Sequence, residues 1–289
     1  MTHLPVRTRE PGRTLVVVSY YDRRPAGNLV GLLESMERYP AGADWHACVV
    51  VNRTTDCPLA LPEGRHVDVE YRPNIGMNIG AWDHGWRRHP GYDHYLFLQD
   101  ECYVVRNGWL AAYLRAAAAP GVGMVGESLN RMWDRSWPAI HDLLRNDRLP
   151  EHGSSPDGSN RVDFYCRQFR EWGVEPGPTG RHLRSVAWFL SGPALERMNG
   201  FFVGRNYGEC IAAEIAASRK LESLGLKVVQ AAEEEFFYIR HLEYNQDYPG
   251  APYSHDVKYV SYSSVKRMLE GRGGPRGWAL RIIARAFHR

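Results

Sequence analysis

The sequence contains no closely spaced pair of cysteines. Its five cysteines are odd in number and widely scattered (Cys48, Cys57, Cys102, Cys166 and Cys210). This pattern argues against a zinc site and a disulfide scaffold, and it suits a reducing compartment. Long apolar runs are also missing. The first one, residues 15–18, is too short for a secretory signal, and none approaches the roughly 18 residues that cross a bilayer. We therefore expect a cytoplasmic protein.

Neither sign of charge is in large excess, and the formal net charge is +3. Residues 266–289 carry seven Lys or Arg and one acid, a net +6, which leaves −3 for the remainder. No basic stripe with interleaved aromatics crosses this slightly acidic body, so we expect no nucleic-acid partner. The tail places Trp278, Ile282 and Phe287 among arginines, which indicates peripheral contact with an anionic membrane. Docking on the protein's own body or on a partner is an equal alternative.

Apolar runs of strand length alternate with segments of helical periodicity. Strands are expected at residues 15–21, 46–52, 66–71, 95–105, 186–192 and 226–230, and helices within 28–39, 74–89, 109–118, 193–198 and 211–224. Residues 133–180 show little periodicity and are expected to be mostly irregular. The alternation predicts the α/β class, with a mostly parallel central sheet flanked by helices.

Polar residues follow the predicted strands. The apolar run 95–98 stops at Gln99, Asp100 and Glu101. Carboxylates at the end of a buried strand are paired, hydrogen-bonded or bound to a metal, unless the strand end simply reaches solvent. Polar runs also follow the first three strands, at residues 19–22, 52–56 and 72–80. Glycines in the last of these permit close backbone approach to an anionic ligand, which a helix N-terminus favours.

Taken in order, these segments resemble the GT-A-type nucleotide-sugar glycosyltransferases, most closely the inverting family 2 enzymes and the rhamnan-synthesis-type proteins. The resemblance covers about residues 15–241. It implies a GT-A-like domain over residues 1–260, with a donor half at about 14–120, an acceptor half at about 121–260, and a basic tail at 261–289.

The resemblance also implies the activity. Such an enzyme moves a sugar from a nucleoside-diphosphate sugar, with UDP- or dTDP-sugars favoured, to an acceptor hydroxyl with inversion. The acceptor would be a glycan or a small natural product. The family's leading acid after the second strand is replaced here by Val51, which weakens the case for uridine. The donor-binding residues carried over by position are Ser19, Tyr20, Tyr21, Asn52, Asp56, Arg72, Asn74, Gly76, Asn78, Gly80, Gln99 and Asp100.

The segment from Gln99 to Glu101 aligns with the family's D-x-D motif, which holds a divalent metal on the donor diphosphate. Gln99 replaces the first acid, Glu101 matches the second, and Asp100 is a substitute if the strand ends early. His241 stands where many relatives place a metal- or diphosphate-binding histidine. Mg²⁺ or Mn²⁺ suits such oxygen ligands. Metal-independent transfer is the alternative.

Two glutamates are candidates for the catalytic base. Counting back from Gly225, at the end of the predicted helix 211–224, places Glu214 at the family's catalytic acid. Glu209 is the second candidate, because it follows a Gly-Phe-Phe stretch much as the family's acids do. A solvated helix face is the structural alternative for both. Trp188, Ser191 and Gly192 correspond to the strand and turn beside the acceptor, although Trp188 is equally suited to the core.

Two other functions are alternatives, and the sequence argues against the second. A non-catalytic relative that binds nucleotide sugars would explain the replacement of family acids by Val51 and Gln99. A sugar-nucleotide pyrophosphorylase would need a Gly-rich loop with Arg and Lys after the first strand, which the sequence lacks. A Rossmann G-x-G-x-x-G is also missing there, which argues against NAD enzymes and common methyltransferases.

Overall fold

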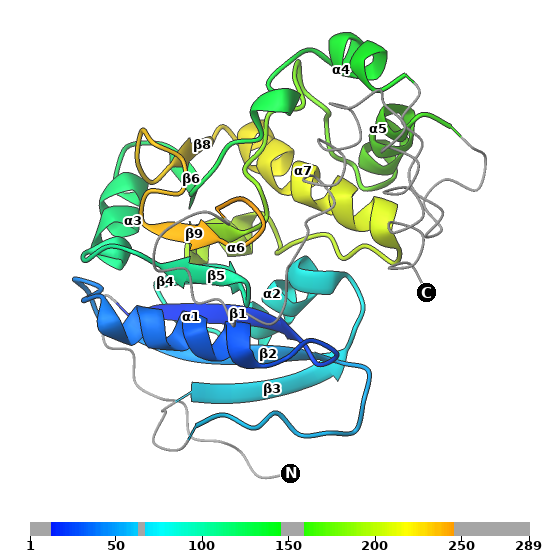
Figure 1. The fold of residues 1–289 in the computed structure, drawn as a ribbon. Coiled ribbons are helices and arrows are strands. Elements are labelled where there is room, and N and C mark those ends of the chain that lie inside the picture. The colour runs from blue at the N-terminus through cyan, green and yellow to red at the C-terminus, as the bar shows by residue number, and fades with distance from the viewer. Residues whose placement is uncertain (1–12, 63–66, 146–158, 246–289) are drawn as a thin grey trace, which may run out of the picture.

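The computed structural model describes residues 13–62, 67–145 and 159–245. Within them, seven strands form one sheet in the order β3-β2-β1-β4-β7-β6-β8 (Figure 1). These strands are β1 (Thr14–Tyr21), β2 (Trp45–Arg53), β3 (Val67–Pro73), β4 (His94–Gln99), β6 (Val122–Gly126), β7 (Ala187–Ser191) and β8 (Lys227–Gln230). The basic tail at 261–289 lies outside the described residues, and the division into donor and acceptor halves remains a prediction.

The sheet is mostly parallel. β1 pairs in parallel with β2 and β4, β2 with β3, and β6 with β8, whereas β7 runs antiparallel between β4 and β6. β1 is buried almost throughout, as expected of a central parallel strand whose two faces are both covered. Because β7 is reversed, its beginning lies at the edge where the other six strands end. Ligands collect at this carboxyl edge in open α/β sheets.

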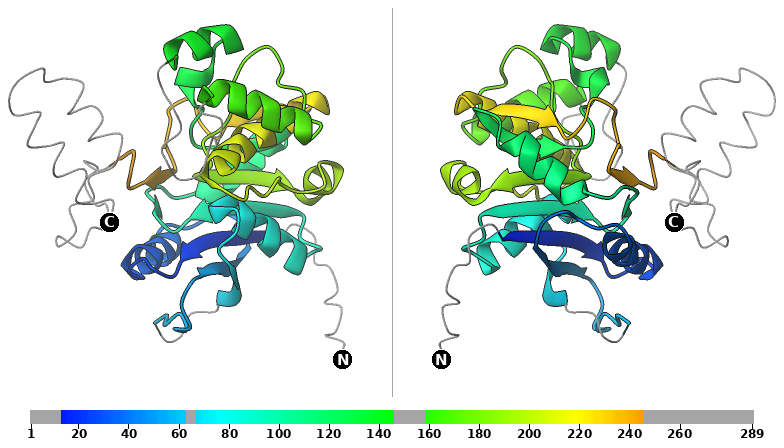
Figure 2. Two further views of the ribbon diagram at one scale, coloured as in Figure 1. Left: turned by 90° about the vertical axis from the view of Figure 1, so that its right-hand side faces the viewer. Right: turned by 90° about the vertical axis from the view of Figure 1, so that its left-hand side faces the viewer.

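Helices cover both faces of the sheet, which confirms the predicted α/β class (Figure 2). Alternate side chains of β1 point to opposite faces, so Val16 and Val18 enter one hydrophobic cluster while Leu15 and Val17 enter the other. The first cluster includes α1 (Gly27–Arg38) and α3 (Trp109–Ala117); the second includes α2 (Met77–Arg88), α6 (Gly192–Arg197) and α7 (Tyr207–Ser223). No helix in the described part of the chain is long and apolar enough to cross a membrane.

The prediction of one strand over 95–105 is wrong. β4 ends at Gln99, Asp100 and Glu101 form a turn, and β5 (Cys102–Val104) pairs antiparallel with β9 (Ile239–His241) in a separate two-stranded sheet. Apolar residues on both sides of the acids look like one strand, but distant pairing partners decide where each strand ends. The turn therefore sets both acids at the carboxyl edge.

Residues 133–180 contain more helix than expected. A 3₁₀ turn (Arg131–Trp133) precedes α4 (Trp137–Leu143), and α5 (Arg161–Glu171) follows. Their apolar residues form a third cluster with α7, at the upper right of Figure 1. Large aromatic side chains dominate this small core, and their contacts with α7 stabilise short helices whose own periodicity is weak.

Candidate active site at the carboxyl edge of the sheet

The loops after β1 and β2 are tied together by one acid. The Asp22 carboxylate accepts hydrogen bonds of 2.7–2.9 Å from the backbone N–H and hydroxyl groups of Thr54 and Thr55. Burial alone would raise the pKa of Asp22, but these hydrogen bonds outweigh it and lower the pKa to about 2. Asp22 therefore stays ionised and fixes the geometry of both loops.

The loops after β2 and β3 are joined through Asn52 and Arg72. The Asn52 side chain, 3% exposed, donates to the Met77 carbonyl at 3.0 Å and accepts from Arg72 Nη1 at 2.6 Å. Arg72 Nη2 donates to the Ile75 carbonyl at 2.7 Å. These bonds hold the backbone at the start of α2, where N–H groups are available to an anion.

Two glycines make that backbone path possible. Gly76, the residue before α2, has φ +76°, and a Cβ there would lie 2.4 Å from Val203 Cγ1. A Cβ on Gly80 would lie 2.1 Å from the Ile75 carbonyl oxygen. The glycine-spaced segment is therefore required by the turn itself, whatever it binds.

The other predicted donor residues differ in how far they are buried. Ser19 and Tyr20 are buried: Ser19 Oγ donates to the Leu98 carbonyl at 3.3 Å, and the Tyr20 hydroxyl donates to the Arg24 carbonyl at 2.6 Å. Tyr20 belongs to the hydrophobic core, so it presents no ring to a nucleobase. Tyr21 is half-buried, and Asn74 and Asp56 are exposed, with Asp56 paired to Arg53 at 3.0 Å.

Three predicted residues from different segments converge on the backbone of one residue, Ser185. Its carbonyl accepts from Asn78 Nδ2 at 2.8 Å and from Gln99 Nε2 at 2.5 Å, while its N–H donates to Glu214 Oε1 at 2.8 Å. Ser185 lies directly before Val186 and β7, at the carboxyl edge. The backbone of one residue thus connects the α2 segment, the end of β4 and the middle of α7.

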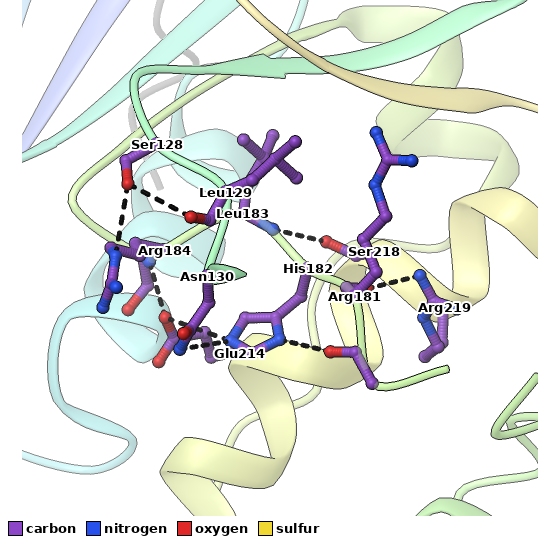
Figure 3. Close-up of polar contacts among 12 residues, drawn as sticks. Ser128, Leu129, Asn130, Arg181, His182, Leu183, Arg184, Glu214, Ser218 and Arg219 are labelled. Atoms are coloured by element: carbon purple, nitrogen blue, oxygen red, sulfur yellow. Dashed lines mark hydrogen bonds and ion pairs between the residues drawn. The ribbon is translucent and has the colours of Figure 1, made fainter. Parts of the chain in front are cut away.

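Glu214 is mostly buried, with its side chain 15% exposed. Burial raises its pKa, although the Ser185 N–H and the charge of Arg184 act in the opposite direction. Figure 3 shows the Glu214 carboxylate, His182 and Asn130 pointing toward one another. His182 Nδ1 donates to the Gly180 carbonyl at 2.7 Å, and burial lowers the pKa of His182 to about 4. The ring is therefore neutral, and its 3.9 Å approach to Glu214 is not an ion pair.

Glu209, the second candidate base, caps its own helix. Its backbone N–H donates to Asn206 Oδ1 at 3.0 Å, and its carboxylate accepts from Asn206 Nδ2 and from the backbone and side chain of Arg205. This is a capping arrangement at the start of α7. Burial would raise the pKa of Glu209, but the hydrogen bonds from Arg205 outweigh it and lower the pKa.

The two acids of the turn after β4 differ in their surroundings. Asp100 is 5% exposed, and its Oδ2 has no hydrogen-bond partner in the part of the chain that is described. Burial raises the pKa of Asp100 to about 7, despite the opposing charge of Arg24. Glu101 is 4% exposed and forms an ion pair with Arg24 through Oε2.

His241 lies beside these acids, as the resemblance implied, with Nε2 3.9 Å from Glu101 Oε2 and 3.2 Å from Gln99 Oε1. Its Nδ1 is 3.2 Å from the Glu243 backbone N–H, which can only donate. Nδ1 is therefore an acceptor, and the proton of the neutral ring is on Nε2, where it points to Gln99. Burial lowers the pKa of His241 to about 4, which is consistent with a neutral ring.

These contacts do not fit a divalent ion. The His241 nitrogen that faces Glu101 carries a proton, Gln99 supplies an amide in place of an acid, and a guanidinium pairs with Glu101. Within residues 13–62, 67–145 and 159–245, no group of three His, Cys, Asp or Glu converges as a metal-binding set. The predicted metal residues Asp100, Glu101 and His241 thus lie in one region of the fold. Glu101 Oε2 and His241 are bonded to other partners, whereas Asp100 Oδ2 and Glu101 Oε1 have no hydrogen-bond partner among the described residues.

The predicted acceptor residues are not at this edge. Trp188 is 0% exposed and packs against Trp82 and Phe201 in the core. Ser191 pairs with His94 at the beginning of β4, and its side chain caps α6, so Ser191 and Gly192 lie at the opposite edge of the sheet. The reversed direction of β7 is the reason: its beginning, and not its end, faces the site.

A cavity of about 810 Å³ opens where β6 and β8 end. Its lining includes Gln230 and charged side chains of both signs, which are Arg131, Asp134, Arg135, Arg181 and Glu233. Glu214 does not line it, but Arg181 in its wall is the neighbour of His182, which lies 3.9 Å from Glu214. Arg131 also pairs with Glu235 at 2.5 Å, which in turn accepts from Ser128 Oγ at 3.0 Å. Its polar walls suit a hydroxyl-rich or charged molecule.

Several residues of the site carried no sequence signal. Arg24, Ser185 and Glu243 belong to segments with no motif, and only distant contacts bring them together. Buried Glu127, at the end of β6, accepts from the Tyr113 hydroxyl at 2.9 Å and the Ile239 N–H at 3.0 Å. It thereby anchors the β9 segment that carries His241.

Comparison with known proteins gives only a distant likeness. No family model matches the chain, and no curated protein matches it. Among the solved structures that match is the mannosyltransferase PcManGT from Pyrobaculum calidifontis, in complex with GDP-Man and Mn²⁺. It has a TM-score of 0.47 and 14% sequence identity, and the match covers 78% of this chain and 55% of that one. The chain therefore spans about half the length of that protein, and a likeness of this degree carries no argument about activity.

Proposed function

We propose that this protein is a nucleotide-sugar-dependent glycosyltransferase with Glu214 as its general base. The observation that carries the proposal is the convergence of Asn78, Gln99 and Glu214 on the backbone C=O and N–H of Ser185, at the carboxyl edge of a mostly parallel sheet. The three residues belong to segments that the family resemblance assigns to the donor sugar, the diphosphate and the base.

In this proposal the donor lies across the loops after β1, β2 and β3. The backbone at Gly76–Gly80 and the start of α2 supply N–H groups to the diphosphate, and the Asn52–Arg72 pair holds that backbone in place. Asn78 and Gln99 are already fixed by the Ser185 carbonyl, so their positions require little reorganisation when the donor binds.

The chemical step needs one base. The Glu214 carboxylate removes the proton from an acceptor hydroxyl, the acceptor oxygen forms a bond to the anomeric carbon, and the bond to the diphosphate breaks. The diphosphate leaves with the electron pair, and attack from the opposite side inverts the anomeric centre. Burial raises the pKa of Glu214 above its usual range, which favours proton acceptance from a weakly acidic hydroxyl.

The acceptor site in this proposal is the cavity at the ends of β6 and β8. Its volume of about 810 Å³ accommodates one or more sugar units, and its lining by Arg, Asp, Glu and Gln side chains suits a hydroxyl-rich glycan or small natural product. This assignment replaces Trp188, Ser191 and Gly192 as acceptor residues, since those are buried or lie at the far edge.

The second candidate is a non-catalytic protein that binds nucleotide sugars. One observation favours it: Glu214 already accepts a hydrogen bond from the Ser185 N–H, which is a structural role that needs no chemistry. A binding protein would keep the donor loops and the Ser185 convergence without turnover.

A two-stage experiment separates these functions. The full chain is first screened by thermal shift against UDP-, dTDP- and GDP-sugars, each with Mn²⁺ and with EDTA. Sugars that stabilise the protein are then incubated with a panel of glycan acceptors, and released nucleoside diphosphate is measured. Stabilisation with release supports the transferase, and stabilisation without any release supports the binding protein. If no nucleotide sugar stabilises the protein or is consumed, both functions are refuted.

A further inference from the structure

We propose that the donor diphosphate is neutralised by the guanidinium groups of Arg24 and Arg184, without a divalent metal. This inference rests on the proposed function, because it concerns the same donor. It departs from the D-x-D resemblance, and it starts from the finding that the contacts of Gln99, Glu101 and His241 do not fit a metal ion.

Arg24 lies in the loop after β1 and contacts the turn after β4. Its guanidinium pairs with the Glu101 carboxylate, and the two side chains differ in exposure: 38% for Arg24 and 6% for Glu101. The acid is therefore the inner member of the pair and the cation the outer one. A ligand that approaches the carboxyl edge meets positive charge at the place where the D-x-D resemblance predicts a metal bound to an acid.

Arg184 lies on the other side of β4, directly before Ser185 and β7. Its Nε donates to Ser128 Oγ at 3.2 Å (Figure 3). Its guanidinium lies 4.8 Å from the centre of the Tyr244 ring, so the side chain is held by two contacts. Glu243 interacts electrostatically with both Arg24 and Arg184, which places the two cations around one acid. The backbone next to Arg184 is that of Ser185, the peptide to which Asn78 and Gln99 donate.

A metal at this position would have to break existing bonds. To ligate through Nε2, His241 would need its proton moved to Nδ1, where the Glu243 N–H already donates. Arg24 holds Glu101 Oε2, so an ion bound at the other oxygen, Oε1, would lie close to a guanidinium charge. Guanidinium groups need no such change, because their N–H donors match phosphate oxygens in paired geometry.

The charges are consistent with this role. A metal ion assists departure of a diphosphate by neutralising the charge that develops on its oxygens, and fixed cations in a partly buried site do the same. Arg24 also offsets the Glu101 carboxylate, which would otherwise repel the ligand.

The test is nucleotide affinity with and without metal, measured by isothermal titration of the full chain with UDP, dTDP and GDP in EDTA and in Mn²⁺. We expect at least one of them to bind with dissociation constants that agree within about threefold in the two conditions. Removing a charge-assisted contact should weaken binding by about 10- to 100-fold. We expect that loss in Arg184→Ala, and in Arg24→Ala combined with Glu101→Gln, which removes the carboxylate that Arg24 pairs with.

Two further variants decide between a metal and the arginines. Glu101→Gln alone should keep or tighten nucleotide binding in EDTA, because a repelling charge is removed, whereas a metal site would lose its Mn²⁺-dependent binding. Arg23→Ala removes the same charge from the neighbouring exposed position, where Nε contacts Thr54 Oγ1 at 3.1 Å, and should change little. An equal loss in Arg23→Ala would refute a specific role for Arg24.

The outcomes also separate this inference from the proposed function. Nucleotide binding that requires Mn²⁺ and is lost in Glu101→Gln overturns the arginine inference and leaves the transferase intact. Failure of all three nucleotides to bind in both conditions refutes the proposed function, and the inference with it. Binding in EDTA that is weakened in both arginine variants supports the inference.

Discussion

Replacing Glu214 by Gln tests the proposed base directly. Gln keeps the oxygen that accepts the 2.8 Å hydrogen bond from the Ser185 N–H, but it cannot take a proton at neutral pH. The loss should equal the contribution of a general base, about 10²–10⁴-fold in turnover, or about 3–5 kcal/mol in the barrier. Nucleotide binding should be unchanged, because Glu214 acts on the acceptor.

The assay is release of nucleoside diphosphate from the stabilising nucleotide sugar, with an acceptor or with water, measured between pH 4.5 and 8.5. Burial raises the pKa of Glu214, and only the ionised form is a base, so wild-type turnover should fall as the pH drops through a value above 4.5. Glu214→Gln should lose this dependence. Its melting temperature should not fall, because the buried carboxylate that it removes is costly to ionise.

Glu209→Gln is the matched control on the same helix. It weakens the capping contacts with Arg205 and Asn206, so we expect a loss of about 1–2 kcal/mol in stability, near 2–6 °C in melting temperature, with turnover retained. Full activity in Glu214→Gln together with an inactive, folded Glu209→Gln would transfer the role to Glu209. Full activity in both variants would place the base outside α7.

Three other substitutions test individual features. Asp100→Asn should raise the melting temperature at pH 8 and not at pH 4. Burial raises the pKa of Asp100 from 3.8 to about 7, so the wild-type protein should lose up to about 4 kcal/mol of unfolding free energy as the pH rises from 3.8 to about 7. Equal stabilities at pH 8 would contradict this. Gly80→Ala should lower the unfolding free energy by about 1–3 kcal/mol and weaken nucleotide binding, because its Cβ would lie 2.1 Å from the Ile75 carbonyl oxygen. Gly27→Ala is the control in denaturant unfolding, because a Cβ at Gly27 has no atom within 4 Å. Trp188→Ala should lower the unfolding free energy by about 3–5 kcal/mol and leave the acceptor affinity of the folded protein unchanged. A selective loss of acceptor affinity would restore the acceptor role of Trp188.

Local chemistry in the sequence was sufficient to predict the fold class and the placement of two acids at the carboxyl edge of the sheet. The consecutive apolar residues of β1 are all removed from water only when both faces of the strand are covered, which favours a parallel sheet between helices. An apolar run that stops at Asp100 and Glu101 requires those acids to lie at a strand end, and the turn after β4 places them there. The glycines at positions 76 and 80 are needed by a backbone path that no larger residue permits.

Only the tertiary structure decided which residues meet. The direction of β7 is not encoded in its own apolar residues, because a strand has the same alternation in both directions. Antiparallel pairing with β4 sets that direction and places Ser191 at the far edge, and Trp188 is buried in the core. The Ser185 peptide and the Arg24–Glu101 pair have no local pattern, because each joins segments that are distant along the chain. Hydrogen bonds then fixed what the residue types left open: of the two glutamates of α7, Glu209 became part of a helix cap, and Glu214 became a mostly buried carboxylate that accepts from the Ser185 N–H.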